Sequence, residues 1–204
     1  MADIETMEAG GFRFRDSGLQ WFALLEGAHP AYNTLDLVYK NIATPEWVAI
    51  YQFAPYEALA KVSPVLIKLD HPHKWLQQWQ QVFPGLAGSM LGSETSLETV
   101  ADHLRTLVSV RVEGGVDSLF RFHDSWIASA LYPTLEDTER AKFHGPICQW
   151  LWPRGGEVCR AERPGEMPTE DQALSEGWLQ LSTESQLAVH QGLMSKRNWK
   201  EGQR

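Results

Sequence analysis

The stretch "LETVADHLRTLVSVRVEGGVDSLFRFHDSW", residues 97–126, decides the fold, because it predicts a helix followed by a β-hairpin. Its first part has apolar residues at three- and four-residue spacing, which places them on one face of a helix. These residues are Leu97, Val100, Ala101, Leu104 and Leu107. At the start of this segment, Thr95 and Glu98 form a capping-box pattern that predicts where the helix begins.

The second part of the stretch predicts two paired strands. Two runs rich in valine and phenylalanine flank the turn "EGG" at 113–115, where glycine supplies the positive φ angles that a tight turn needs. In a strand, alternate side chains share a face, so Phe120 and Phe122 are expected on one side and Arg121 and His123 on the other. The hairpin therefore presents an apolar face and a polar face.

Upstream of the stretch, short apolar runs alternate with helical patterns. Strands are predicted within 19–30, 46–53 and 64–69, and helices within 31–41, 55–62 and 71–83. The glycine-rich segment 84–94 separates the last of these helices from the one that opens the stretch. Alternating strands and helices favour a sheet covered by helices over a bundle or a sandwich.

Downstream, residues 125–152 are predicted to be mainly helical, with a break at Gly145-Pro146. The segment 153–172 is rich in Pro, Gly and charge and is predicted to be a loop or linker, and a last helix is predicted at 183–196.

The predicted fold class is therefore α/β (mixed α+β), with a mixed β-sheet flanked by helices. We expect a flexible N-terminus at 1–18, a sheet-containing lobe at 19–124 and a smaller, mainly helical C-terminal lobe at 125–204 with a flexible stretch at 153–172.

The composition is typical of a soluble binding module. Among 204 residues, 43% are apolar and nine are tryptophan, so a core can form and aromatic groups remain for contacts with other proteins. The net charge of -8 lacks the basic field that nucleic-acid binding needs, and no run approaches membrane-spanning length. Cys148 and Cys159 lack zinc spacing and are expected to be reduced. We predict a cytoplasmic protein that binds neither nucleic acid nor a membrane.

The segment "DHPH" is the first candidate for chemistry. Asp70, His71 and His73 would hold a zinc or nickel ion if a further ligand, such as His103 or His123, came from elsewhere, and a metal-assisted hydrolase is the alternative function. The simpler interpretation is a helix start at which Asp70 or His71 caps free amides. We favour the cap, because two histidines one residue apart lack the spaced ligand set of metal sites, and we predict no metal, no cofactor and no enzyme activity.

His123 and Asp124 are the second candidate. A catalytic dyad requires the carboxylate to bond the imidazole, but neighbours on a strand point to opposite faces. Asp124 is better interpreted as the cap of a helix that begins near Ser125.

Arg111 and Arg121 are the third candidate. They have the same parity on adjacent strands, so both are expected on the less apolar face. Like charges side by side need acids nearby, from this chain or from a partner, and a solvated face is the simpler alternative.

Together these residues resemble the type VI secretion effector adaptor family, the Tap or TEC chaperones, over roughly residues 19–152. The segment His103-Leu104-Arg105 is similar to that family's helix, and Phe120, Arg121, Phe122 and Asp124 are similar to its Phe-Arg-Phe-Tyr-Asp-Pro ending. His123 stands where the family commonly has Tyr, Ser125 where it has Pro, Glu26 where it has Asp, and Ser63 where it has Gly. Neither His123 nor Ser125 can therefore be a required catalytic group by this resemblance.

The resemblance implies a cytoplasmic, non-catalytic adaptor that binds a toxic effector and loads it onto the VgrG spike of the secretion machine. The partner-binding or motif candidates are Arg111, Arg121, His123, Asp124, Trp126, Trp178 and Leu193, and the structural motif candidates are His103, Arg105, Phe120 and Phe122.

The C-terminal helix leaves two possibilities open. It bears Leu187, Val189, Leu193 and Met194, which something must cover. Either it docks on this protein's own sheet lobe, or it serves as a groove or arm that receives the effector.

Overall fold

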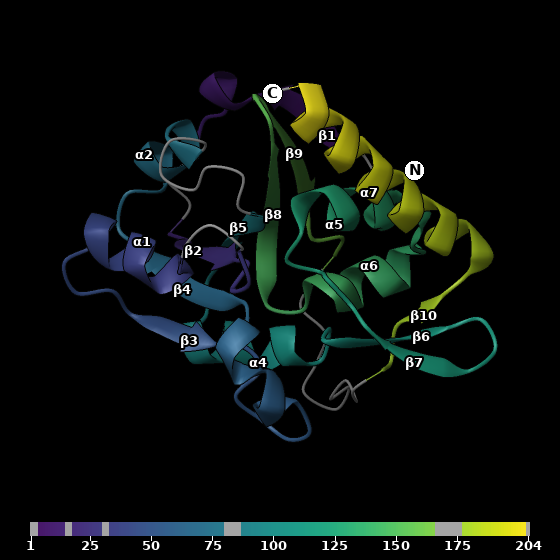
Figure 1. Ribbon diagram of the computed structural model, residues 1–204. Coiled ribbons are helices and arrows are strands. Elements are labelled where there is room, and N and C mark those ends of the chain that lie inside the picture. The colour runs from purple at the N-terminus through teal and green to yellow at the C-terminus, as the bar shows by residue number, and fades with distance from the viewer. Residues whose placement is uncertain (1–3, 15–17, 30–32, 80–86, 166–176, 203–204) are drawn as a thin grey trace.

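A seven-stranded antiparallel sheet, with strand order β1-β9-β8-β5-β2-β4-β3, forms the centre of the protein (Figure 1). The structure is a computed structural model that describes residues 4–14, 18–29, 33–79, 87–165 and 177–202. The strands are β1 (Glu5–Glu8), β2 (Gln20–Leu25), β3 (Trp47–Ala49), β4 (Val65–Leu69), β5 (Gly88–Ser93), β8 (Ile147–Arg154) and β9 (Glu157–Glu162).

A smaller three-stranded sheet contains the predicted hairpin. Its strands β6 (Ser109–Val112) and β7 (Val116–Leu119) are antiparallel, and β10 (Gln180–Leu181) pairs with β6 in parallel. Gly114 and Gly115 have φ angles of 90° and 77°, as a turn of this kind requires. The second strand is shorter than predicted, because β7 ends before Phe120.

Helices cover both faces of the large sheet, because its strands carry apolar side chains on both sides. The helices are α1 (Thr34–Asn41), α2 (Pro72–Gln77), α4 (Leu97–Arg105), α5 (Ser125–Leu131), α6 (Asp137–His144) and α7 (Thr183–Gly202), with short 3₁₀ helices η1 (Ala9–Gly11), η2 (Tyr56–Val62) and η3 (Tyr132–Thr134). In β2, Phe22 and Leu24 join the hydrophobic cluster of α4 and α5, whereas Trp21, Ala23 and Leu25 join that of α1 and α2. The predicted mixed α/β class is confirmed. Among the described residues, no helix is long and apolar enough to cross a membrane.

Two strands stand where a helix and a loop were expected. The prediction of helix up to residue 152 is wrong at its end, because Trp150 and Trp152 of β8 point into one core and Leu151 into the other. The prediction of a loop from 153 is wrong where β9 pairs with β8. Pro153 fits in β8 because it lies beyond Leu151, the last residue that pairs with β5. Strands from both sides of the expected boundary at residue 124 therefore share one sheet.

Two other strands, β1 and β5, form in segments whose amino-acid composition does not predict a strand. β5 lies in the glycine-rich segment, where a Cβ on Gly88 would stand 2.8 Å from the Trp79 ring, so glycine allows this close packing. At the N-terminus, residues expected to be flexible form β1 instead, which pairs with β9 from Glu5↔Arg160 to Glu8↔Glu157.

Several predicted element ends shift by a few residues. The α4 cap is Ser96, whose Oγ accepts a hydrogen bond from Thr99 N at 3.2 Å, so the prediction of Thr95 as cap is wrong. The strand predicted at 46–53 is limited to β3. α2 ends at Gln77, and the Val82 and Phe83 positions of its predicted face lie outside the described residues.

The C-terminal helix α7 docks on the protein itself, against α5, which in turn packs on β8 of the large sheet (Figure 1). A Cβ on Gly192 would stand 2.4 Å from the Trp126 carbonyl oxygen, so the two helices approach closely at a glycine. Closer to the C-terminal end of α7, the ring of Trp199 lies 6.0 Å from the ring of Trp126.

Candidate functional site

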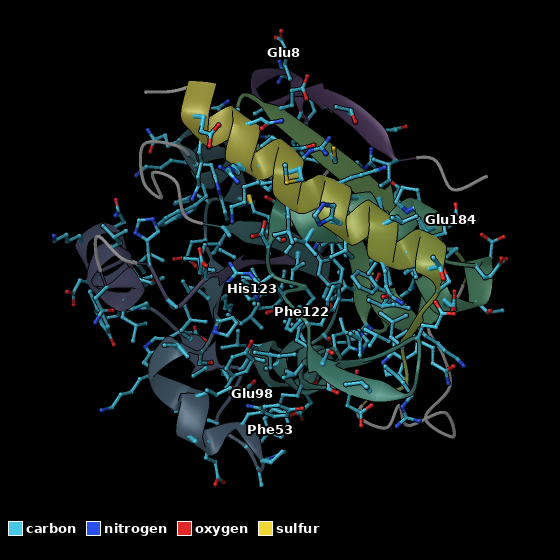
Figure 2. All side chains as sticks on the ribbon, turned by 45° about the vertical axis from the view of Figure 1, so that its right-hand side comes forward. Glu8, Phe53, Glu98, Phe122, His123 and Glu184 are labelled. Carbon is cyan, nitrogen blue, oxygen red and sulfur yellow. The ribbon has the colours of Figure 1, made fainter. Side chains whose placement is uncertain are left out.

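The segment that follows the hairpin joins the core to a cluster of charges. Phe120 and Phe122 are 4% and 0% exposed and lie in the larger core cluster. Arg121, between them, turns the other way and ends among acidic groups. Figure 2 shows Phe122 and His123 near the centre of the molecule, below α7 in that view.

Four side chains from three distant parts of the chain form what we call the polar junction: Glu26, Arg121, Asp124 and Lys196. Arg121 Nη2 donates to Glu26 Oε1 at 2.5 Å and lies 3.5 Å from Asp124 Oδ2. Lys196 Nζ of α7 donates to the same Asp124 oxygen at 2.5 Å. The junction therefore ties the end of β2, the end of the hairpin and the C-terminal helix together.

Asp124 has two structural roles at this point. Its Oδ1 accepts a hydrogen bond from Trp126 N at 3.2 Å, so it caps α5. Its side chain is 1% exposed and its charge is balanced by Arg121 and Lys196. A carboxylate so deeply buried is tolerated because two cations and an amide satisfy it.

Glu26 connects the junction to two further segments. Its backbone N–H donates to Ala87 O at 2.8 Å, and its Oε2 accepts from Ala87 N at 3.4 Å. Its carbonyl oxygen accepts a hydrogen bond from Thr34 Oγ1 at the start of α1, at 2.6 Å. A shortened side chain here would affect the entry to β5 and leave Arg121 with one fewer acid.

Burial and the neighbouring charges set the protonation of Arg121 and His123. Burial disfavours the charged guanidinium, but the hydrogen bond and charge of Glu26, helped by Asp124, more than offset it and raise the pKa of Arg121. Burial, with the positive charge of Arg121, lowers the pKa of His123 to about 4. His123 Nδ1 has no hydrogen-bond partner in the described structure, and no bond to Asp124 forms. The pair does not have the geometry of a catalytic dyad.

Arg111 and Arg121 do not form one patch. Arg111 Nε donates to Asp117 Oδ1 on the hairpin at 3.0 Å, with both side chains about half exposed, whereas Arg121 pairs with Glu26. Each arginine thus has acids of its own within the chain.

His103 and Arg105 hold α4 against its surroundings. His103 Nε2 donates to Phe143 O at 2.9 Å, and burial lowers the pKa of His103 to about 4, so its ring is neutral. A Cβ on Gly145 would stand 2.4 Å from the His103 ring, which explains the glycine there. Arg105 pairs with Asp102 and lies 6.0 Å from the Phe53 ring.

The aromatic and apolar candidates of the C-terminal part lie in different surroundings. Trp126 is covered by Trp199 and by the Arg154 guanidinium, 5.4 Å from its ring. Trp178 is partly buried against the core. Leu193 is 43% exposed on α7. Of these three, Leu193 is the most accessible to a partner.

The alternative of a metal site at Asp70, His71 and His73 lacks support from the described residues. In the parts of the chain that the structure describes, no three His, Cys, Asp or Glu side chains converge to hold a metal ion. Asp70, His71 and His73 are exposed, and the His73 ring contacts Phe14 at 4.5 Å. His71 is the residue before α2, but no side-chain cap forms there.

A protein family described as "Domain of unknown function (DUF4123)" matches residues 21–142. The chain belongs to the DUF4123 family. Over 104 residues it is 32% identical to "Accessory protein VasW" of Vibrio cholerae serotype O1, which covers 50% of this chain and 30% of that protein. The match thus spans less than a third of that relative's length. No solved structure matches the chain.

The DUF4123 assignment confirms the resemblance to the type VI secretion effector adaptor family and associates the chain with type VI secretion. The matched span contains Glu26, Arg121 and Asp124, but Lys196 lies beyond it. The contact of α7 with the polar junction is therefore made from outside the DUF4123 region.

Sequence reasoning missed two members of the polar junction. In the sequence, Glu26 is noticed only because the resembled family has Asp at this position. Lys196 is noticed only as part of the last predicted helix. An acid after a buried strand and a lysine on the docked face of a helix are weak signals, because their partners are 95 and 72 residues away.

Proposed function

We propose that this protein is a non-catalytic adaptor of type VI secretion that binds a toxic effector and loads it onto a VgrG-type spike protein in the cytoplasm. The observation that carries the proposal is the DUF4123 match over residues 21–142. The side chains of the family motif also support the proposal, because they have structural roles: Asp124 caps a helix, His103 bonds a backbone carbonyl in the core and Arg121 pairs with Glu26.

The hairpin is the proposed contact for the spike. It lies within the matched family region, and members of a family that bind the same kind of spike protein are expected to use the same surface. Its Val116 and Leu119 are 59% and 51% exposed, and Arg111 lies on the same strand pair. A hollow of about 600 Å³ lies between its turn and the start of α7. Leu119 shares its strand face with Asp117, the ion-pair partner of Arg111, and an exposed apolar group beside an arginine is typical of a protein-binding surface.

The effector contact is proposed for the region beyond residue 142, where the family match ends. Trp178 and Leu193 are the candidates there. An adaptor serves effectors that differ from one another, so this contact is expected in the part of the chain that differs as well.

Co-purification of the full chain with the spike and effector proteins encoded beside it tests the proposal. We expect each pair and the three-protein complex to form. Val116→Asp should weaken spike binding and spare effector binding, whereas Val62→Asp, at an apolar residue 44% exposed on η2, is the matched control. Failure of all three complexes would contradict the adaptor function.

A further inference from the structure

Apolar residues lie on both faces of α7, because Val189 packs against the core and Trp199 against Trp126, whereas others point outward. The buried residues of α7 are Ser185 and Gly192, which are small. Three further large apolar residues of α7, Leu187, Leu193 and Met194, are 59%, 43% and 42% exposed. A surface helix that completes a single domain normally turns its apolar residues inward, and these three do not. The outward face is therefore suited to being covered.

Four residues at three- and four-residue spacing form what we call the outer stripe: Leu187, His190, Gln191 and Met194. All four are exposed. In Figure 2, α7 crosses the front of the molecule, with Glu184 near its N-terminal end. The stripe is accessible along its whole length.

The outer stripe is complementary to itself. If a second copy of α7 lies antiparallel across it, with a two-fold axis passing between His190 and Gln191, Leu187 stands opposite Met194 of the second copy. The same axis places Glu184 opposite Arg197 of the second copy. In the shallow crossing of about 20° that packed helices often adopt, these two charged side chains lean toward each other. The two-fold axis thus produces two apolar contacts between Leu187 and Met194 and two ion pairs between Glu184 and Arg197.

We infer that the outer stripe of α7 binds a second copy of this chain, in an antiparallel arrangement. A parallel arrangement places Glu184 opposite Glu184 and Arg197 opposite Arg197, and like charges oppose it. Arg197 is free to change partner, because its ion pair with Glu201 at 2.9 Å is exposed and such pairs contribute little.

The interface is small, so the dimer is reversible. Stable interfaces as a rule bury at least about 1,000 Å², and the contact between two stripes of four residues is small on that scale. Leu193 points about 100° away from Met194 around the helix, so it stays outside the stripe and accessible to other proteins. The inference goes beyond the adaptor function, and the purified chain alone is enough to test it.

Sedimentation equilibrium of the full chain, from low micromolar to the highest soluble concentration, tests the inference. We expect the mass to rise from monomer to dimer. Glu184→Arg and Arg197→Glu should each weaken self-association by at least about tenfold, because each variant alone places two like-charge pairs across the axis. An equimolar mixture of the two variants should associate like the unmodified chain, because the mixed dimer restores both ion pairs.

Leu187→Glu should also abolish the dimer, whereas Leu59→Glu, at an apolar residue 36% exposed on η2, should leave it unchanged. Thermal unfolding of each variant confirms that the fold is kept. A chain that stays monomeric at every concentration overturns the inference, as does a mixture that fails to restore association. A monomer whose Leu187→Glu variant loses affinity for the spike or the effector overturns it too, because the stripe then serves another protein.

Discussion

Lys196 of α7 places its ammonium group 2.5 Å from Oδ2 of Asp124, the residue that caps α5. The Asp124 side chain is 1% exposed and that of Lys196 is 14% exposed, so the pair is largely removed from water. Few side chains of α7 are fully buried, and this ion pair holds the helix together with the Trp126–Trp199 contact, the close approach at Gly192 and the packing of Val189. The docking of α7 is therefore coupled to the family motif through one carboxylate.

Replacing Lys196 by methionine is expected to lower the free energy of unfolding by about 2–4 kcal/mol, because it leaves a buried carboxylate with Arg121 as its remaining cation. Urea unfolding followed by tryptophan fluorescence measures the change. Lys200→Met, at an exposed position of the same helix, should shift stability by under about 0.5 kcal/mol. Equal effects of the two variants would show that the ion pair does not hold α7.

Substitutions of Phe122 and His123, which follow the hairpin, are expected to differ in their effect on stability. Phe122→Ala should cost about 3–5 kcal/mol, because its side chain is 0% exposed and leaves a cavity. His123 is 4% exposed, so alanine there also leaves a cavity, but His123→Leu fills it and removes an unpartnered nitrogen. We expect His123→Leu to keep both the melting temperature and partner binding. Loss of binding with unchanged melting would give His123 a direct functional role.

Three buried histidines predict a loss of stability in mild acid. Burial lowers the pKa from 6.5 to about 4 in His103 and His123 and to about 3 in His144. Each ring binds its proton more readily in the unfolded chain, so its contribution to stability is complete above pH 6.5 and is lost as the pH falls toward the folded-state value. The expected slope reaches about 4 kcal/mol per pH unit if all three rings take up a proton on unfolding.

Urea unfolding at a series of pH values between neutral and about pH 4 measures this slope. His103→Gln should reduce it by about one proton, because the amide can still donate to Phe143 O without titrating. His71→Gln, at an exposed position outside the outer stripe, is the control and should leave the slope unchanged. An identical slope for all three proteins would show that buried histidines do not govern the acid response.

The sequence predicted the helices and the hairpin best, because their signals are local. Spacing identifies the buried face of α4, and two glycines mark the β6–β7 turn. β5 and β8 escaped prediction because their signals are not local. Glycine in β5 allows the close approach of Trp79, and Pro153 lies in β8 beyond the last residue that pairs with β5. The polar junction was predictable in part, since Arg121 needs acids but nothing near it in the sequence identifies Glu26.

Gly192 predicts how closely α7 must approach α5. Alanine is favoured over glycine inside a helix by about 1 kcal/mol, so Gly192→Ala would stabilise α7 if space allowed. A Cβ there stands 2.4 Å from the Trp126 carbonyl oxygen, so we expect the substitution to destabilise the protein instead. The exposed Ser195→Ala change on the same helix is the matched control and should be neutral or slightly stabilising. Thermal unfolding of both variants distinguishes the two effects, and a stabilised Gly192→Ala protein would mean that the helices lie further apart.

Removing α7 tests whether the C-terminal helix serves the effector as well as the fold. A chain ending near Pro153 would break β8 and remove β9, so the informative truncation ends after Ser182. It removes Lys196 and Trp199 but no strand, and we expect a folded lobe with a lower melting temperature. Under the adaptor proposal, effector binding falls and spike binding survives, because the spike contact lies in the DUF4123 region. The full-length Lys196→Met variant separates weakened docking from loss of the helix itself. Full affinity of the truncated chain for both partners would exclude any role of α7 in effector delivery.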